Sequence, residues 1–99
     1  MEISLTPLGV GTSVSTYVAR CVDLIDRSGL DYQLHAMGTV VEGQLDALLT
    51  LLQQCIDALL ADCDRVTVSA KFDCRKGASG RLRGKVDAVE QRLGHRLKT

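Results

Sequence analysis

The chain has 99 residues, of which 45% are hydrophobic and only 3% aromatic. This length predicts a single domain with a core of Leu, Val, Ile and Ala, and the shortage of aromatic rings argues against modules that stack nucleic-acid bases on a sheet. No apolar run approaches the roughly 20 residues of a membrane span, so a membrane is not an expected partner. Nucleic acid is not expected either, because of the shortage of rings.

Charge is unevenly distributed, although the formal net charge is zero. Residues 1–74 carry four basic and ten acidic side chains, whereas residues 75–99 carry eight basic and two acidic ones. Such asymmetry is typical either of a basic tail that meets nucleic acid or an anionic ligand, or of complementary surfaces between subunits. Because the basic segment is also amphipathic, complementarity between subunits is the favoured interpretation.

The four cysteines, Cys21, Cys55, Cys63 and Cys74, form no C-x-x-C pair. Zinc ribbons and thioredoxin-type motifs are therefore not indicated, and no metal site is predicted. The sequence starts directly with a strand pattern and not with a signal peptide. We therefore expect reduced cysteines in a cytoplasmic protein.

The first segments predict a strand, a glycine turn and a helix. Residues 2–8 alternate between polar and apolar side chains, as in a half-buried strand that Pro7 ends or places at an edge. A glycine turn follows, in which Thr12 or Ser13 caps the next helix. Its amides could hold a phosphate or a carboxylate, and a tight turn without a ligand is the simpler interpretation. A helix is predicted over residues 14–28 from apolar positions at helical spacing.

The remaining segments predict a hairpin, a helix, a strand and a last helix. The predicted elements are strands at 31–36 and 38–42, a helix at 44–62, a strand at 65–73 and a helix at 81–97. Leucines at helical spacing give the strongest periodic signal in the chain. They predict a core stripe made of Leu45, Leu48, Leu49, Leu52, Ile56, Leu59 and Leu60.

This order of elements is that of the split βαβ, ferredoxin-like pattern. The predicted fold class is therefore α+β, a βαββαβ sandwich with an additional C-terminal helix, in one domain over residues 1–99. Two helices cover one face of the sheet. The other face is predicted to be polar, and to be solvated, covered by the last helix, packed on another subunit or used for a ligand. It carries Ser4, Thr6, Gln33, His35, Thr67, Ser69 and Lys71.

The heptapeptide from Met37 to Gly43, MGTVVEG, interrupts the strand pattern that precedes it and the helical pattern that follows it. Gly38 can turn the chain back, and Glu42 ends the third strand just before the next helix. A carboxylate at this place is suited to binding a donor or a cation. The simpler alternative is that Glu42 stabilises the positive end of the helix that follows it.

Three further segments combine with this heptapeptide: Thr6-Pro7-Leu8-Gly9-Val10-Gly11, Ser13-Val14-Ser15-Thr16-Tyr17-Val18 and Ser28-Gly29-Leu30-Asp31-Tyr32. With them, the chain resembles the small thiamine-binding protein family from residue 2 to about residue 93, and departs from it in the glycine-rich loop at 75–80 and in its number of cysteines. The resemblance implies a standalone ferredoxin-like domain that binds thiamine or its hydroxymethylpyrimidine moiety without catalysis and without a cofactor. It also implies a homo-oligomer, typically a tetramer assembled from dimers.

The chemistry of thiamine then suggests the candidate site residues. Glu42 could accept a hydrogen bond from the aminopyrimidine or neutralise the thiazolium cation. Thr39 could supply a hydroxyl group, and the Met37 thioether could lie against a flat ring, with a hydrophobic plug at a subunit contact as the alternative. Ser13 and the glycine turn could hold a hydroxyl or phosphate group. Tyr32, His35 and Lys71 are further candidates.

Three other functions have to be weighed. A regulatory or assembly module that binds a different ligand, such as an amino acid, would use the same polar face. An acylphosphatase-like enzyme would need an arginine in the turn at residues 9–13, which has none, so no catalytic residue is predicted. RNA binding through the basic tail is disfavoured by the shortage of rings.

Overall fold

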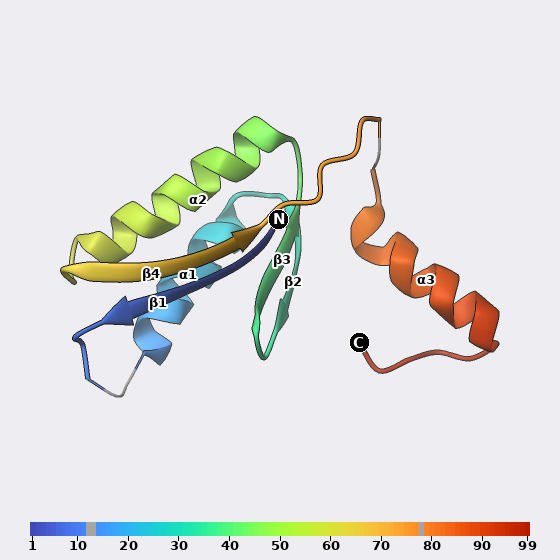
Figure 1. Ribbon diagram of the computed structural model, residues 1–99, viewed down its shortest axis with the longest axis horizontal. Coiled ribbons are helices and arrows are strands. Elements are labelled where there is room, and N and C mark those ends of the chain that lie inside the picture. Colours follow the sequence, from blue (N-terminus) through green and yellow to red (C-terminus); the bar gives the residue numbers. More distant parts are fainter. Residues whose placement is uncertain (12–13, 78) are drawn as a thin grey trace.

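The structure is a computed structural model that describes residues 1–11, 14–77 and 79–99. Its elements in chain order are β1 (Glu2–Leu8), α1 (Ser15–Arg27), β2 (Asp31–His35), β3 (Gly38–Glu42), α2 (Leu45–Leu60), β4 (Arg65–Lys71) and α3 (Arg81–Leu93). This is the βαββαβ order followed by a final helix (Figure 1), so the prediction of a ferredoxin-like α+β fold is confirmed.

The four strands form one antiparallel sheet in the order β2-β3-β1-β4. β1 pairs with β4 over its whole length, but with β3 only at Glu2 and Ile3. Pro7 therefore lies within the strand, at a point where β1 has a paired neighbour on one side only. A proline is tolerated there because no second neighbour needs its missing N–H.

The core lies between the sheet and the pair of helices α1 and α2, which cover the same face (Figure 1). Its buried residues are aliphatic side chains and thiols: Ile3, Cys21, Ile25, Val41, Leu48, Leu51, Cys55, Leu59 and Cys63. Burying one such aliphatic side chain is worth about 1.5–3 kcal/mol. The α1–α2 layer is therefore the main source of stability.

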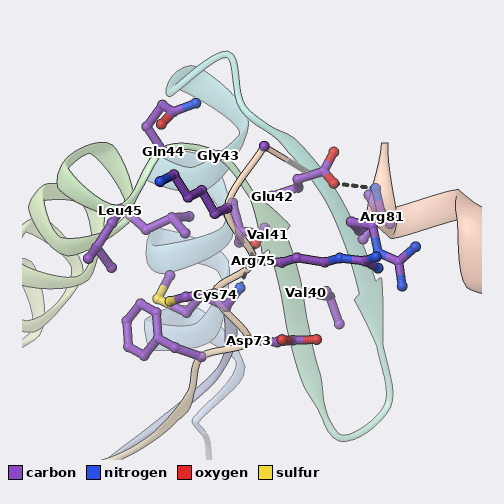
Figure 2. A pocket seen from close by; sticks show the side chains of 16 residues that line it. Val40, Val41, Glu42, Gly43, Gln44, Leu45, Asp73, Cys74, Arg75 and Arg81 are labelled. Atoms are coloured by element: carbon purple, nitrogen blue, oxygen red, sulfur yellow. Dashed lines mark hydrogen bonds between the residues drawn. The ribbon is translucent and has the colours of Figure 1, made fainter. Parts of the chain in front are cut away.

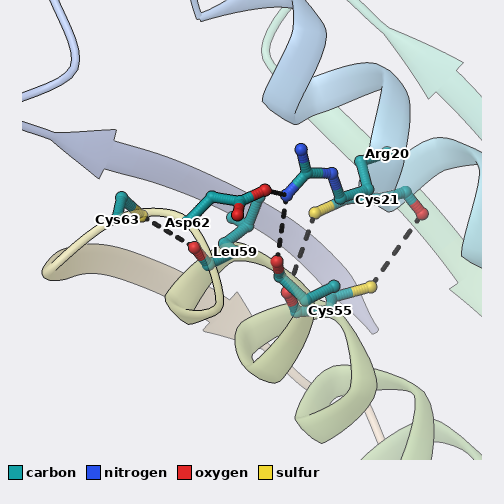
Figure 3. A network of polar contacts seen from close by, with 7 residues as sticks. Arg20, Cys21, Cys55, Leu59, Asp62 and Cys63 are labelled. Atoms are coloured by element: carbon teal, nitrogen blue, oxygen red, sulfur yellow. Dashed lines mark hydrogen bonds and ion pairs between the residues drawn. The ribbon is translucent and has the colours of Figure 1, made fainter.

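Cys21 on α1 and Cys55 on α2 contact each other between the two helices (Figure 3). The Cys21 thiol donates to the Cys55 carbonyl at 4.0 Å, and the Cys55 thiol donates to the Cys21 carbonyl at 3.9 Å. The contact with Cys21, together with burial, raises the pKa of the Cys55 thiol. It therefore stays protonated and packs as a small apolar residue. Nearby, Arg20 links α1 to the end of α2 through Asp62 at 2.6 Å and the Ala58 carbonyl at 3.1 Å.

The buried stripe of α2 differs from the predicted one. Four positions spaced three or four residues apart face the core, namely Leu48, Leu51, Cys55 and Leu59. Three leucines of the predicted stripe are instead about half exposed, namely Leu45, Leu49 and Leu60. The prediction was wrong at these positions, and it left out Leu51 and Cys55, which complete the buried face together with Leu48 and Leu59.

α3 lies beyond the β2–β3 hairpin and contacts these two strands (Figure 1). It has no buried residue, and Val89 and Leu93 on its apolar side are 42% and 54% exposed. The helix ends at Leu93, short of the predicted residue 97, because Gly94 adopts the left-handed conformation at φ 75° and donates its N–H to Glu90. Within the described residues, no helix has both the length and the apolar character needed to cross a bilayer.

Candidate ligand-binding site

A cavity of about 600 Å³ lies where β3 ends and α2 begins. The segment that follows β4 and the first residues of α3 complete its wall, so four separate parts of the chain meet there (Figure 2). Apolar lining comes mainly from the sheet and from α2, through Val41, Leu45, Leu48 and Phe72. Charged lining comes from Glu42, Asp73, Arg75, Lys76 and Arg81.

Glu42 is the candidate residue that reaches this cavity. Its carboxylate oxygen Oε1 accepts a hydrogen bond from the backbone N–H of Arg81, the first residue of α3 (Figure 2). This hydrogen bond supports the N-terminus of α3. The alternative that Glu42 stabilises the positive end of α2 stays a prediction.

A smaller cavity of about 200 Å³ lies at the opposite end of β3, between the sheet and α1. Met37, Thr39 and His35 belong to its lining. Thr39 is 5% exposed, whereas Met37 is 83% exposed. Because five residues of strand span about 16 Å, the structure places Glu42 apart from Met37 and Thr39. The heptapeptide therefore contributes to two cavities and not to one.

His35 lies on the polar face of the sheet and has local hydrogen-bond partners. Its Nδ1 accepts the Met37 N–H at 3.2 Å, and its Nε2 lies 3.7 Å from the Glu2 carboxylate on β1. His35 can reach over the intervening strand because it is paired there with Gly38, which has no side chain. Lys71 is on the same face, opposite Glu2 on β4, and it lines neither cavity.

Tyr32 is held by α1. Its hydroxyl donates to the Asp26 carboxylate at 2.8 Å, and this hydrogen bond raises the pKa of Tyr32. Its side chain packs against the core from the helix-covered face, where it ties β2 to α1. The remaining candidate, Ser13, lies outside the described residues.

The sequence prediction missed the basic side of the larger cavity, which Arg75, Lys76 and Arg81 form. Arg75 and Lys76 follow β4, and Arg81 begins α3. Within residues 1–11, 14–77 and 79–99, none of the three forms an ion pair with a carboxylate. The abrupt change from acidic to basic composition at residue 75 was the signal that could have identified them.

The cavity thus combines an apolar wall, one carboxylate held at a helix N-terminus and a basic side. Such a lining suits a flat ring that carries a hydrogen-bond donor and a charged substituent. Among the described residues, no group of three or more His, Cys, Asp or Glu side chains is placed to hold a metal ion.

Comparisons with known proteins relate this fold to one family. Residues 1–90 match the sequence model of the family described as "Thiamine-binding protein". A UPF0045 protein of Methanocaldococcus jannaschii is 39% identical over 89% of this chain and 88% of its own length. The crystal structure of a hypothetical protein from that organism matches with a TM-score of 0.83 at 38% identity, and covers 91% of this chain and 93% of that chain.

A Thermotoga maritima protein, provisionally assigned to thiamine biosynthesis or salvage, has a TM-score of 0.79 at 18% identity. The match covers 89% of this chain and 94% of that chain, and at this identity it shows a shared fold alone. The family match over residues 1–90 confirms the resemblance that the motifs indicated, and the chain belongs to the thiamine-binding protein family.

Proposed function

We propose that this chain binds thiamine, or the hydroxymethylpyrimidine moiety of thiamine, in the cavity at the end of β3, and that it does so without catalysis. The observation that carries the proposal is the position of Glu42, a carboxylate on the lining of a cavity that has both an apolar wall and a charged side. The family match supports a ligand of the thiamine class.

Glu42 has the capacity to hold both α3 and a ligand. Its Oε1 accepts the Arg81 N–H, while Oε2 has no hydrogen-bond partner in the part of the chain that the structure describes. The aminopyrimidine ring offers an amino group that can donate to Oε2. A hydrogen bond to a charged group contributes about 1.5–3 kcal/mol.

The apolar wall would hold the ring itself. Leu48 and Phe72 line the cavity, and Leu45 lines it while remaining 50% exposed. A ligand that covers Leu45 removes apolar surface from water, which is favourable by about 25 cal/mol for each Å² buried.

The proposal includes a homo-oligomer, a tetramer assembled from dimers, in the cytoplasm. The exposed Val89 and Leu93 of α3 and the opposite charges of residues 1–74 and 75–99 support contact between copies. All four cysteines are free, which suits a reducing compartment. Sedimentation velocity checks the assembly: we expect a species of four times the 10.7 kDa chain mass, and a monomer at all concentrations would contradict it.

Isothermal titration with thiamine tests the binding site. We expect saturable binding to the unmodified protein, weakened about tenfold or more in Glu42→Gln, which keeps the shape of the side chain and removes its charge. Leu45→Trp should also weaken binding, because the larger side chain fills part of the cavity while Glu42 is unchanged. Asp57→Asn is the matched control, since Asp57 is exposed on α2 and does not line the cavity.

The variant Met37→Ala separates the two cavities. If Met37→Ala weakens thiamine binding while Glu42→Gln and Leu45→Trp do not, the ligand occupies the smaller cavity and the proposed site is wrong. If no heat of binding is found with correctly folded protein, the proposed function is wrong.

A further inference from the structure

The sheet opens between β1 and β3, at the end of β3 away from the larger cavity. The two strands pair only at Glu2 and Ile3, and Figure 1 shows β1 and the β2–β3 hairpin running apart from there. Val18 and Val22 of α1, together with Val14 just before it, complete the wall of this opening. The opening is the smaller cavity of about 200 Å³.

Leu5 of β1 belongs to the lining of this cavity and directs its backbone groups into the opening. In an antiparallel pair, the backbone groups of alternate residues point to the same side of the strand. Met1 exchanges both of its backbone hydrogen bonds with Val41 of β3, so those of Leu5, four residues later, point to the β3 side as well. No residue of β3 is paired with Leu5. Within the described residues, one N–H donor and one C=O acceptor are therefore left without a backbone partner there.

Thr39 adds a hydroxyl group to the same wall. It is paired with Ile3, which makes it a diagonal neighbour of Leu5, at a separation of about 7–8 Å. Thr39 is only 5% exposed, and its hydroxyl forms no hydrogen bond among the described residues. Because no side-chain oxygen of these residues is both sealed off and unpartnered, the little surface that Thr39 keeps includes this hydroxyl. Three polar groups without a partner thus line one cavity, whereas buried polar groups are normally hydrogen-bonded.

The lining offers no charged group to a ligand. None of the described residues on it is Asp, Glu, Lys or Arg. The ring nitrogen atoms of His35 already face the Met37 N–H and the Glu2 carboxylate. A charged ligand would lose its hydration in this cavity without gaining a partner. The chemistry of the lining therefore selects an uncharged ligand.

Apolar side chains mark the mouth of the cavity. Val18, Leu34 and Met37 belong to the lining and are 40%, 55% and 83% exposed. Exposed apolar side chains that gather in this way are typical of binding surfaces. The volume is below the range of about 300–1,000 Å³ for drug-sized ligands and suits a single ring with a small substituent.

We infer that the smaller cavity is a second binding site, separate from the one proposed for thiamine, for an uncharged single-ring molecule that carries both a hydrogen-bond donor and an acceptor. A ring carboxamide has this chemistry. Its donor and acceptor pair with the backbone groups of Leu5, in the place that a continued β3 strand would take, and the Thr39 hydroxyl binds the same polar end. The ring lies against the apolar side chains of α1.

NMR titration of amide shifts tests the ligand class with benzamide and benzoate, which have the same shape. We expect saturable binding of benzamide, with the largest shifts at Leu5 and Thr39. Benzoate should show no saturable binding, because its charge finds no partner. Benzoate binding as tight as that of benzamide, benzamide shifts confined to other parts of the chain, or no binding of benzamide would overturn the inference.

Two variants test the site, with toluene as a probe that has the ring and no polar group. Thr39→Val exchanges the hydroxyl for a methyl group, so it should weaken benzamide about fivefold and leave toluene unchanged. Val18→Trp should abolish binding of both probes by filling the cavity. Ala19→Trp is its matched control, since Ala19 is exposed on α1 and does not line the cavity. Unchanged benzamide binding in Val18→Trp, with a native amide spectrum, would show that the cavity is not the site.

Thiamine separates this inference from the proposed function. Saturating thiamine should leave the affinity for benzamide unchanged, because the two cavities lie at opposite ends of β3. Displacement of benzamide by thiamine would overturn the inference, since one cavity would then serve both. Binding of benzamide by a protein that does not bind thiamine would overturn the proposed function alone. A benzamide affinity that falls with rising protein concentration would show that a second copy occupies the cavity, and would also overturn the inference.

Discussion

α2 and α3 are both amphipathic helices, and they are attached to the same sheet in different ways. α2 buries four side chains against the strands and against α1, whereas α3 buries none. What holds the start of α3 is a polar contact, from its first backbone N–H to the Glu42 carboxylate on β3. An apolar stripe in a sequence therefore indicates that a helix needs a partner, and does not tell whether its own chain supplies one.

The consequence is a division between stability and function. The α1–α2 layer contains the buried core, while the larger cavity lies between that layer and the loosely packed C-terminal segment. Residues that line the cavity from α3 and from its connecting segment can change with little effect on the core. The experiments below test whether the two regions differ as much as their packing indicates.

The largest expected difference is in thiol reactivity. Cys74 is exposed in the segment that leads to α3, whereas Cys21 and Cys55 are buried between α1 and α2. We expect Cys74 to react with an aromatic disulfide reagent about a thousandfold or more faster than the buried pair, which needs the core to open. Stopped-flow absorbance measures both rates, and Cys74→Ser should remove the fast phase. Comparable rates for all three thiols would show that the core layer opens as easily as the C-terminal segment.

The second largest expected difference between the two regions is in how truncating a leucine changes the free energy of unfolding. Leu59→Ala in α2 should lower it by about 2–5 kcal/mol, because Leu59 is 1% exposed and its truncation leaves a cavity. The matched variant Leu93→Ala in α3, at 54% exposure, should change it by less than about 0.5 kcal/mol. Urea denaturation at low protein concentration measures both. If the Leu93→Ala effect grows with protein concentration, contact between copies covers α3. The difference in packing between α2 and α3 then holds only for the single chain.

The attachment of α3 can be weakened without changing the core. Glu42→Gln replaces a hydrogen bond to a charged oxygen by one to a neutral oxygen, at a cost of about 1 kcal/mol. We expect amide exchange at Arg81 to accelerate about fivefold while core amides of α2 keep their rates. Hydrogen exchange followed by NMR resolves both sets. Equal acceleration in α2 would mean that Glu42 supports the whole domain and not α3 alone.

The smallest effect concerns the hydrogen bond that ties α1 to the sheet. Asp26 raises the folded-state pKa of Tyr32, so this bond stabilises the fold below the ordinary tyrosine pKa of about 10 and is lost as pH rises through the higher folded value. The difference in Tm between the unmodified protein and Tyr32→Phe should therefore be small and constant near neutral pH and should shrink in strong alkali. A difference that stays constant in alkali would contradict the assignment of the bond.

The fold was predictable because its signals are local. Alternation over a few residues identified β1 and β4, and β-branched residues after a glycine turn identified β3. The glycines at 38 and 94 lie at a chain reversal and a helix end, where their backbone angles are needed. The errors also have a local cause. Cys55 occupies a core position that a search for leucines overlooks, and Leu45 falls in the leucine pattern although it lies at the cavity, half exposed.

The candidate site was predicted only in part because it depends on contacts between distant segments. Glu42 was identified from its place at a strand end, but its partner Arg81 is 39 residues away in the sequence. The separation of Glu42 from Met37 follows from the length of β3, which a heptapeptide motif conceals. The sequence showed that Arg75 and Lys76 are part of a basic segment, but it did not show that they line a cavity. Nothing in the sequence places the segment after β4 near the end of β3.

The reciprocal contact between Cys21 and Cys55 has a consequence for how this sequence can vary. Each thiol lies against the carbonyl of the other residue, so the two side chains share one small volume between the helix backbones. A larger residue at either position would push α1 and α2 apart, and a smaller one would leave a void. Positions 21 and 55 should therefore change together in functional relatives, so that a larger side chain at one position is matched by a smaller side chain at the other.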